Sequence, residues 1–262
     1  MKRAYVDIPE GQAHYQVGGA GEPLLLLHQT PLSSDEYGNL MPLLTASHRV
    51  IAMDTLGYGK SDRPPKRYQI PDYAQSVAGF IHALGFSRVS VFGHHTGASI
   101  AVELAATHPE LVDKLVISGC PIYSPEALAK RLKSPSYVPM KPVDDGSHVL
   151  KVWQDYSAVF RHPSPEDMQL VFSSYMVAGS GAEDAHGAVF SYDIAPRLTS
   201  IKCPTLLISG TKDFFFERLE ATACLIPHCH TAVIDGGGPL LTVQKPEELA
   251  LATLSFLMQK GV

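Results

Sequence analysis

The chain has 262 residues, of which 45% are hydrophobic and 18% charged, and a formal net charge of −5 at pH 7. This size fits one domain, or one core that carries an insertion, and the negative charge argues against nucleic acid or an anionic membrane as a partner. We find neither a signal peptide nor an apolar run near the ~20 residues that span a bilayer, and four cysteines are too few for a disulfide framework. We expect a cytoplasmic protein that acts on a small molecule, as a monomer or a homodimer.

Short apolar runs alternate with amphipathic segments over the first 120 residues. Strands are predicted at 4–8 and 12–17, joined as a hairpin, and buried strands at 24–27, 50–53, 89–92 and 115–118. Helices are predicted at 33–44, 72–84 and 98–108. This alternation is typical of βαβ units that build a parallel sheet.

The alternation breaks after residue 120 and resumes near residue 201. Between them only helical patterns occur, at 125–132, 149–160, 165–176 and 182–190. Strands at 205–209 and 231–235 and helices at 215–223 and 246–258 follow. We therefore predict a core formed by 1–120 and 201–262, and a helical insertion at 121–200.

The run Gly93-His94-His95-Thr96-Gly97 lies between a predicted strand and a predicted helix. This arrangement is typical of the G-x-S-x-G nucleophile elbow, in which a sharp turn presents a serine. Here the presented residue is His95. The chemistry of the chain therefore has to be worked out from an imidazole at this turn.

Four further motifs follow one another in a known order. His28-Gln29-Thr30-Pro31 matches H-G-x-P except at Gln29, the segment from Asp54 to Ser61 matches D-x-x-G-x-G-x-S, Gly210–Asp213 forms the turn that carries an acid, and Pro246-Glu247-Glu248 begins the last helix. With these motifs the chain resembles the α/β-hydrolase family, specifically its capped branch with epoxide hydrolases, haloalkane dehalogenases and C–C bond hydrolases. The resemblance implies an α/β fold with a mostly parallel, eight-stranded sheet flanked by helices, and a helical cap after the sixth strand.

The same resemblance shows that the usual triad is incomplete. The family's catalytic histidine lies in a G-H-x4-E-x-P pattern, and Pro239 occupies that position here. Of the three triad positions, only the acid, Asp213, is kept. An imidazole reaches further than a serine hydroxyl, so we expect His95 to fill the vacated volume and to hydrogen-bond Asp213 as a His–Asp dyad.

The resemblance also suggests which residues surround this dyad. The backbone N–H groups of Thr30 and Thr96 match the family's oxyanion hole. Gln29 and His94 are expected beside the substrate, although His94 matches a histidine that is more often structural. Five aromatic residues of the insertion are expected to supply the aromatic surface of the cap: Trp153, Tyr156, Tyr175, Phe190 and Tyr192. Of these, Trp153, Tyr175 and Phe190 are expected to contact the substrate. Two histidines of the insertion, His162 and His186, could also reach the site.

We hypothesise an enzyme that hydrolyses an ester, a lactone or a C–C bond beside a carbonyl, in a small and largely apolar substrate. The alternatives are a lyase, decarboxylase or isomerase that uses the same base, a binding protein without turnover, or His95 as a covalent nucleophile. No metal or organic cofactor is implied. Cys224 and Cys229, with His228 and His230 beside them, do not match a zinc spacing.

Overall fold

The computed structural model describes residues 1–133, 141–161 and 163–259. Eight strands form one sheet in the order β1-β2-β4-β3-β5-β6-β7-β8. Strands β1 and β2 pair antiparallel with each other, β2 pairs antiparallel with β4, and the remaining pairs are parallel. The strands are β1 (Lys2–Ile8), β2 (Gly11–Gly18), β3 (Glu22–Leu27), β4 (His48–Met53), β5 (Val89–His94), β6 (Val112–Ser118), β7 (Thr205–Gly210) and β8 (Cys229–Ile234).

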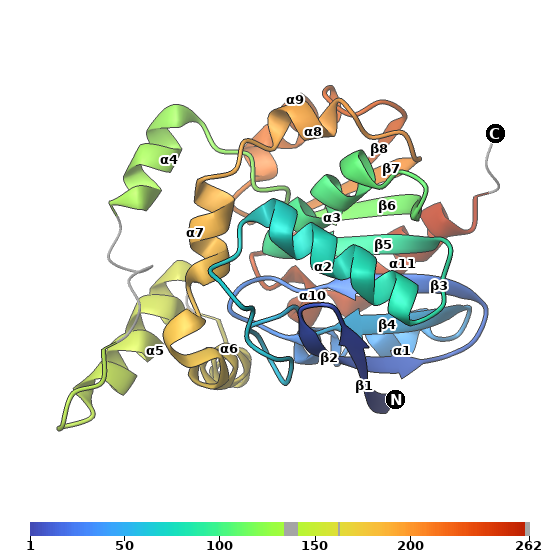
Figure 1. Ribbon diagram of the computed structural model, residues 1–262. Helices are drawn as coiled ribbons and strands as arrows, with labels where there is room; N and C mark the ends of the chain where they lie inside the picture. The colour runs from blue at the N-terminus through green and yellow to red at the C-terminus, as the bar shows by residue number, and fades with distance from the viewer. Residues whose placement is uncertain (134–140, 162, 260–262) are drawn as a thin grey trace.

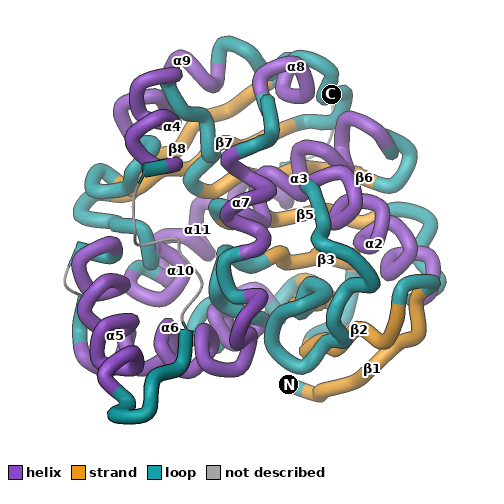
Figure 2. Tube along the Cα trace, turned by 60° about the vertical axis from the view of Figure 1, so that its left-hand side comes forward, coloured by secondary structure: helices purple, strands orange, loops and turns teal. Residues whose placement is uncertain are grey.

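Successive side chains of a central strand point to opposite faces of the sheet, and this divides the core into two parts. In β3, Leu25 and Leu27 join the larger cluster, together with α2 (Ile70–Ala83) and α3 (Thr96–Thr107). Leu24 and Leu26 join the second cluster, with α1 (Met41–Leu44) and α11 (Pro246–Leu257). Helices therefore cover both faces, as Figures 1 and 2 show. Because all four leucines are buried, the apolar run 24–27 reads as an interior strand.

Between β6 and β7 the described residues form helices joined by turns and loops, with no strand among them. It contains α4 (Pro125–Leu132), α5 (Ser147–Val159), α6 (Pro165–Ala178), α7 (Asp184–Phe190) and α8 (Ala195–Leu198). Figure 1 shows α4, α5, α6 and α7 to the left of the sheet, whereas the short α8 packs against α3. Helix α9 (Leu219–Ala223) follows β7. The four helices predicted from the sequence in this segment are present, and α8 is an additional short one.

The predicted helix at 33–44 is wrong as a single element. The structure has a 3-10 turn at Ser34–Tyr37 and then the short helix α1. Pro42 is in the first turn of α1 and has no N–H to donate back to the preceding turn, so a continuous helix cannot pass through it. The predicted helix at 215–223 is also two elements, a 3-10 turn at Phe216–Arg218 and α9.

The turn between β5 and α3 has the geometry of a nucleophile elbow. His95 lies between the two elements with φ 48° and ψ −108°, a conformation that L-residues rarely adopt. A Cβ atom on Gly93 would overlap the carbonyl oxygen of Gly97, and one on Gly97 would overlap the carbonyl oxygen of Leu27. Both flanking glycines are therefore required by close backbone approach, which explains their spacing in the sequence.

Within the described residues, none of the helices has the length and apolar character needed to cross a bilayer.

The last helix of the chain, α11, packs against the sheet through Leu249, Phe256 and Leu257. A further short helix, α10 (Leu241–Gln244), precedes it.

Candidate active site

The structure brings His95 and Asp213 together at the carboxyl edge of the sheet. His95 follows β5 and Asp213 follows β7, and His95 Nε2 lies 2.7 Å from Asp213 Oδ2. Both residues are buried, with 8% and 6% of their surfaces exposed. The carboxylate accepts this hydrogen bond, so Nε2 carries the proton and Nδ1 is the nitrogen left for proton transfer.

The carboxylate of Asp213 is also held from its other side. Its Oδ1 accepts the backbone N–H of Phe215 at 2.9 Å, which fixes the side chain within its own turn. Burial by itself would raise the pKa of Asp213, but the charge and hydrogen bond of His95 and the hydrogen bond from Phe215 outweigh it and lower the pKa. Asp213 is therefore ionised at neutral pH and can stabilise a positive charge on the imidazole.

The imidazole of His95 is confined on several sides. Its ring stacks on that of His94 with centroids 4.3 Å apart and meets the edge of Phe215 at 5.5 Å. Next to the dyad lies Gly119, at φ 63°, and a Cβ atom there would overlap Cδ2 and Nε2 of His95. These neighbours surround the ring in the position in which it contacts Asp213.

His94 lies beneath His95 and is fully buried. Its Nε2 donates to the carbonyl oxygen of Pro239 at 3.2 Å, and its Nδ1 accepts from Ser118 Oγ at 3.0 Å. Burial, reinforced by the neighbouring His95, lowers the pKa of His94 to about 3, so its ring is neutral. His94 was expected beside the substrate, but it does not line the pocket described below; it supports the His95 ring from behind.

The position of the missing family histidine is tied to the oxyanion loop by a buried network. The side-chain amide of Gln29 donates to the carbonyl oxygen of Pro239 at 3.0 Å, and its backbone N–H donates to Glu36 Oε2 at 2.9 Å. Thr242 Oγ1 donates to Glu36 Oε1 at 2.7 Å. Burial raises the pKa of Glu36 to about 8, despite these hydrogen bonds. Sequence reasoning missed Glu36, because one of its two partners, Thr242, lies 206 residues away in the chain.

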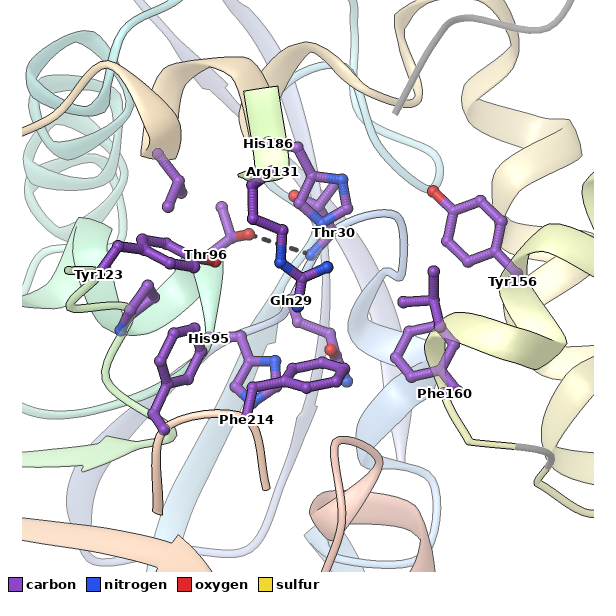
Figure 3. A pocket seen from close by; sticks show the side chains of 14 residues that line it. Gln29, Thr30, His95, Thr96, Tyr123, Arg131, Tyr156, Phe160, His186 and Phe214 are labelled. Atoms are coloured by element: carbon purple, nitrogen blue, oxygen red, sulfur yellow. Dashed lines mark hydrogen bonds between the residues drawn. The ribbon is translucent and has the colours of Figure 1, made fainter. Parts of the chain in front are cut away.

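The two expected oxyanion donors are close together at the start of α3. The backbone N–H of Thr30 points to Thr96 Oγ1 at 3.4 Å, which is a long hydrogen bond (Figure 3). Thr96 is the first residue of α3, where a backbone N–H has no acceptor within the helix. Both residues line the same pocket as His95.

This pocket, which we call the His95 pocket, lies between the sheet core and the helices of the segment between β6 and β7. Its cavity volume is about 40 Å³, within a wider space of about 470 Å³ that includes open solvent. From the core it is lined by Gln29, Thr30, His95 and Thr96. Figure 3 shows His95 beside Phe214, with Arg131 of α4 and His186 of α7 reaching in from the cap. The remaining lining residues are Pro121, Tyr123, Tyr156, Val159, Phe160, Val189 and Phe215.

Three expected lining residues lie behind this surface. Trp153 packs against Phe172 of α6, with ring centroids 5.7 Å apart. Tyr175 packs against Tyr156, so Tyr156 rather than Tyr175 faces the pocket. Phe190 is buried against other rings, including that of His186. The sequence indicated that the insertion is rich in aromatic residues, but it did not show which side of each helix faces the pocket. In α5, for example, Tyr156 faces the pocket and Trp153, three residues earlier, does not.

Of the two cap histidines, His186 reaches the pocket, and its Nδ1 contacts Glu183 Oε2 at 2.8 Å. His162 lies outside the described residues. His28, in contrast, is enclosed in its loop: Nδ1 donates to the carbonyl oxygen of Gln29 and Nε2 accepts from the backbone N–H of Thr55.

Within residues 1–133, 141–161 and 163–259, no three His, Cys, Asp or Glu side chains gather as a group that could hold a metal ion. Cys224 and Cys229 are free thiols, one exposed and one partly buried. Cys229 is the first residue of β8, the edge strand opposite β1, and Cys224 ends α9.

Comparison with known proteins agrees with this fold. The 2-hydroxy-6-oxo-6-(2'-aminophenyl)hexa-2,4-dienoic acid hydrolase of Metapseudomonas resinovorans is 24% identical over 95% of this chain and 89% of its own. The 2-(acetamidomethylene)succinate hydrolase of Mesorhizobium japonicum is 28% identical over 96% of this chain and 94% of its own. Among solved structures, the enol-lactonase of Burkholderia xenovorans LB400 superposes with a TM-score of 0.82, at 20% identity, over 98% of this chain and 100% of that one.

The sequence signature described as "alpha/beta hydrolase fold" matches residues 22–246, from the start of β3 to the first residue of α11. This match includes the elbow, the acid turn and the whole segment between β6 and β7. The fold class expected from the motifs, a mostly parallel eight-stranded sheet flanked by helices, is therefore confirmed. The chain belongs to the α/β-hydrolase fold family.

Proposed function

We propose that this protein is a hydrolase in which His95 and Asp213 form an acid–base dyad that replaces the serine triad. Its substrate is a small carbonyl compound: an ester, a lactone or a ketone with a cleavable C–C bond. The observation that carries the proposal is the 2.7 Å contact between His95 Nε2 and Asp213 Oδ2 at the wall of the His95 pocket. The relatives named above are hydrolases, which supports a hydrolytic reaction.

The reaction begins with a water molecule beside His95 Nδ1. The imidazole takes a proton from this water as the hydroxide attacks the substrate carbonyl, and the ionised Asp213 stabilises the resulting imidazolium. The tetrahedral oxyanion then collapses and expels the leaving group, which takes its proton from His95. Water and substrate are consumed, two products form, and the dyad returns to its starting state.

The developing oxyanion would be stabilised by backbone donors of Thr30 and Thr96. The long Thr30 N–H contact to Thr96 Oγ1 is weak enough to be exchanged for an oxyanion. The hydroxyl of Thr96 also lies next to this position and can supply a donor itself. Each donor removed from such a hole lowers kcat by about 100-fold or more.

We further propose that residues 121–200 act as a cap domain over the core formed by 1–120 and 201–262. The proposed steps need no cofactor, because proton transfer by the dyad and attack by water complete them. We place the protein in the cytoplasm, where it acts as a monomer or a homodimer on a substrate held under the cap.

The proposal is tested with a panel of aryl esters, lactones and vinylogous β-diketones. For any substrate that is turned over, His95→Ala and Asp213→Asn should each lower kcat by about 100-fold or more, and the double variant should lose little more than the worse single variant. His108→Ala and Asp113→Asn replace the same residue types on the surface and should leave kcat unchanged.

Fluorophosphonates, which modify activated serines, should not label the wild-type protein. Unchanged turnover in His95→Ala, or strictly additive losses in the double variant, would contradict the dyad. Stoichiometric fluorophosphonate labelling of a serine would place catalysis elsewhere in the chain.

A further inference from the structure

The side chain of Gln29 ends at the His95 pocket in a fixed orientation. Gln29 is buried, and it lines the pocket together with His95 and Thr30. The carbonyl oxygen of Pro239, 3.0 Å away, can only accept a hydrogen bond, so the group that faces it is the amide nitrogen, Nε2. A longer contact from Nε2 to Glu36 Oε1, at 3.4 Å, agrees with this orientation. The amide oxygen of Gln29, Oε1, therefore faces away from Pro239.

This amide oxygen is an acceptor that the protein itself does not use. Among the residues that the structure describes, none donates a hydrogen bond to Gln29 Oε1, and the atom keeps some exposed surface. A polar atom at the wall of a pocket is satisfied by water or by a bound molecule when the protein offers no partner. Gln29 Oε1 is thus available to a molecule inside the His95 pocket.

Gln29 and His95 are brought together by one carbonyl group. The oxygen of Pro239 accepts from Gln29 Nε2 and from His94 Nε2, at 3.0 and 3.2 Å. The ring of His94 in turn stacks on that of His95, with centroids 4.3 Å apart. In Figure 3 the Gln29 side chain ends beside the His95 ring. The cavity volume of about 40 Å³ exceeds the roughly 10–15 Å³ that one water molecule needs.

We propose that Gln29 binds and orients the attacking water: Gln29 Oε1 accepts one O–H group of the water while His95 Nδ1 accepts the other. The inference rests on the proposed function, in which His95 is the base. A water molecule with both O–H groups engaged directs a lone pair at the substrate carbonyl. As the new carbon–oxygen bond forms, one proton passes to Nδ1 and the carbonyl electron pair becomes the oxyanion. The second proton stays on the attacking oxygen, hydrogen-bonded to Gln29.

This arrangement selects water over an alcohol as the nucleophile. Methanol has a single O–H group, so methanol that donates to His95 leaves Gln29 Oε1 without a donor. An acceptor that loses its donor in a closed site destabilises that complex relative to the one with water. We therefore expect the protein to transfer an acyl group to water in preference to methanol, and this preference to depend on Gln29.

The test measures the preference with phenyl acetate in a water–methanol mixture. NMR quantifies acetate and methyl acetate, after subtraction of the uncatalysed reaction, and the ratio of the two products does not depend on how much of the protein is folded. Gln29→Met keeps the length of the side chain and removes the amide. We expect this variant to lower the ratio of acetate to methyl acetate about tenfold and kcat by a similar factor, with KM unchanged. Gln29→Glu keeps an acceptor oxygen and should retain most of the wild-type ratio.

Thr242→Val is the matched control, because it removes a hydrogen bond to Glu36 from the same buried network and does not touch the pocket. It should leave the product ratio unchanged. An unchanged ratio in Gln29→Met, or an equal fall of the ratio in Thr242→Val, would overturn the inference. The proposed function fails separately, if His95→Ala turns over phenyl acetate as fast as the wild type. A large loss of turnover in His95→Ala with an unchanged ratio in Gln29→Met removes only the role of Gln29.

Discussion

The His95 ring has room at the elbow because residue 119 has no side chain. A Cβ atom on Gly119 would lie inside the space taken by Cδ2 and Nε2 of the imidazole, which is also the edge that contacts Asp213. A serine at the elbow would be shorter, so the presence of an imidazole imposes a steric condition on its neighbour. Gly119 is therefore a positioning residue for the dyad.

We predict that Gly119→Ala displaces the ring and breaks the His95–Asp213 hydrogen bond. The expected readout is loss of the downfield Nε2 proton resonance of His95 in NMR, with a loss of turnover as large as that of Asp213→Asn. Gly85→Ala is the control, because Gly85 also has positive φ, 77°, but has open space where a Cβ atom would lie. Both changes should cost about 1 kcal/mol of backbone strain. An intact Nε2 resonance in Gly119→Ala would show that the ring can be accommodated elsewhere.

At the scale of elements, the loop after β3 and the loop after β8 are joined through Gln29, Glu36 and the carbonyl oxygen of Pro239. In relatives of this family the second loop carries the catalytic histidine; here it contributes a backbone carbonyl to a structural network. The buried carboxyl of Glu36 accepts from the backbone of one loop and from Thr242 after the other. The network therefore joins the loop after β3 to the segment after β8.

The pKa of about 8 for Glu36 predicts how stability depends on pH. Because this pKa is above the ordinary value near 4.5, the folded state binds one more proton than the unfolded state between these two values. The contribution of Glu36 to the free energy of unfolding is complete below pH ~4.5. It is lost as the pH rises toward ~8, at up to about 1.4 kcal/mol per pH unit. His94 acts in the opposite direction, because burial lowers its pKa from 6.5 to about 3. Its contribution to the free energy of unfolding therefore increases as the pH rises from about 3 to 6.5.

Glu36→Gln isolates the first effect. We expect the free energy of unfolding, measured by urea denaturation from pH 5 to 8.5, to fall with pH in the wild type relative to Glu36→Gln and to level off above pH ~8. The comparison between variants cancels the contribution of His94, which both contain. Parallel stability curves for the two proteins would mean that Glu36 is ionised at neutral pH.

At the scale of the whole molecule, Tyr58 links the sheet core to the helical segment between β6 and β7. Its hydroxyl donates to the carbonyl oxygen of Ala182 at 3.3 Å and accepts the backbone N–H of Ala185 at 3.1 Å. These contacts hold the start of α7, the helix that carries His186 into the His95 pocket. The loop between β4 and α2 therefore determines where one wall of the pocket lies.

We predict that Tyr58→Phe loosens α7 without disturbing the core. Tyr37→Phe is the matched control, because it removes a buried hydroxyl that donates to the carbonyl oxygen of Leu27 within the core. Each change should cost about 1 kcal/mol of global stability, but only Tyr58→Phe should increase amide hydrogen exchange in α7. Equal exchange in α7 for both variants would contradict the role given to Tyr58.

Local patterns in the sequence determined much of this protein. The apolar run 24–27, the glycine-flanked turn at His95 and the acid turn at Asp213 are each recognisable within a few residues, because strand burial and tight turns restrict side chains locally. The order of these motifs led to the fold and to the family. The contact between His95 and Asp213 was predicted from two departures from the family motifs: His95 stands where a serine is expected, and Pro239 where a histidine is expected.

Only the tertiary structure decided the surroundings of the dyad. Arg131 and Phe214 are about 80 residues apart, and neither has a sequence pattern that distinguishes it from a surface arginine or a core aromatic. The partners of Glu36 and the room at Gly119 also depend on segments that meet only after folding. The pocket is not lined by Trp153, Tyr175 or Phe190, of which the first two pack against other aromatic rings of the insertion. The aromatic residues of a helix can be buried on more than one of its sides. Periodicity shows that a face is apolar; which neighbour covers that face depends on packing between distant elements.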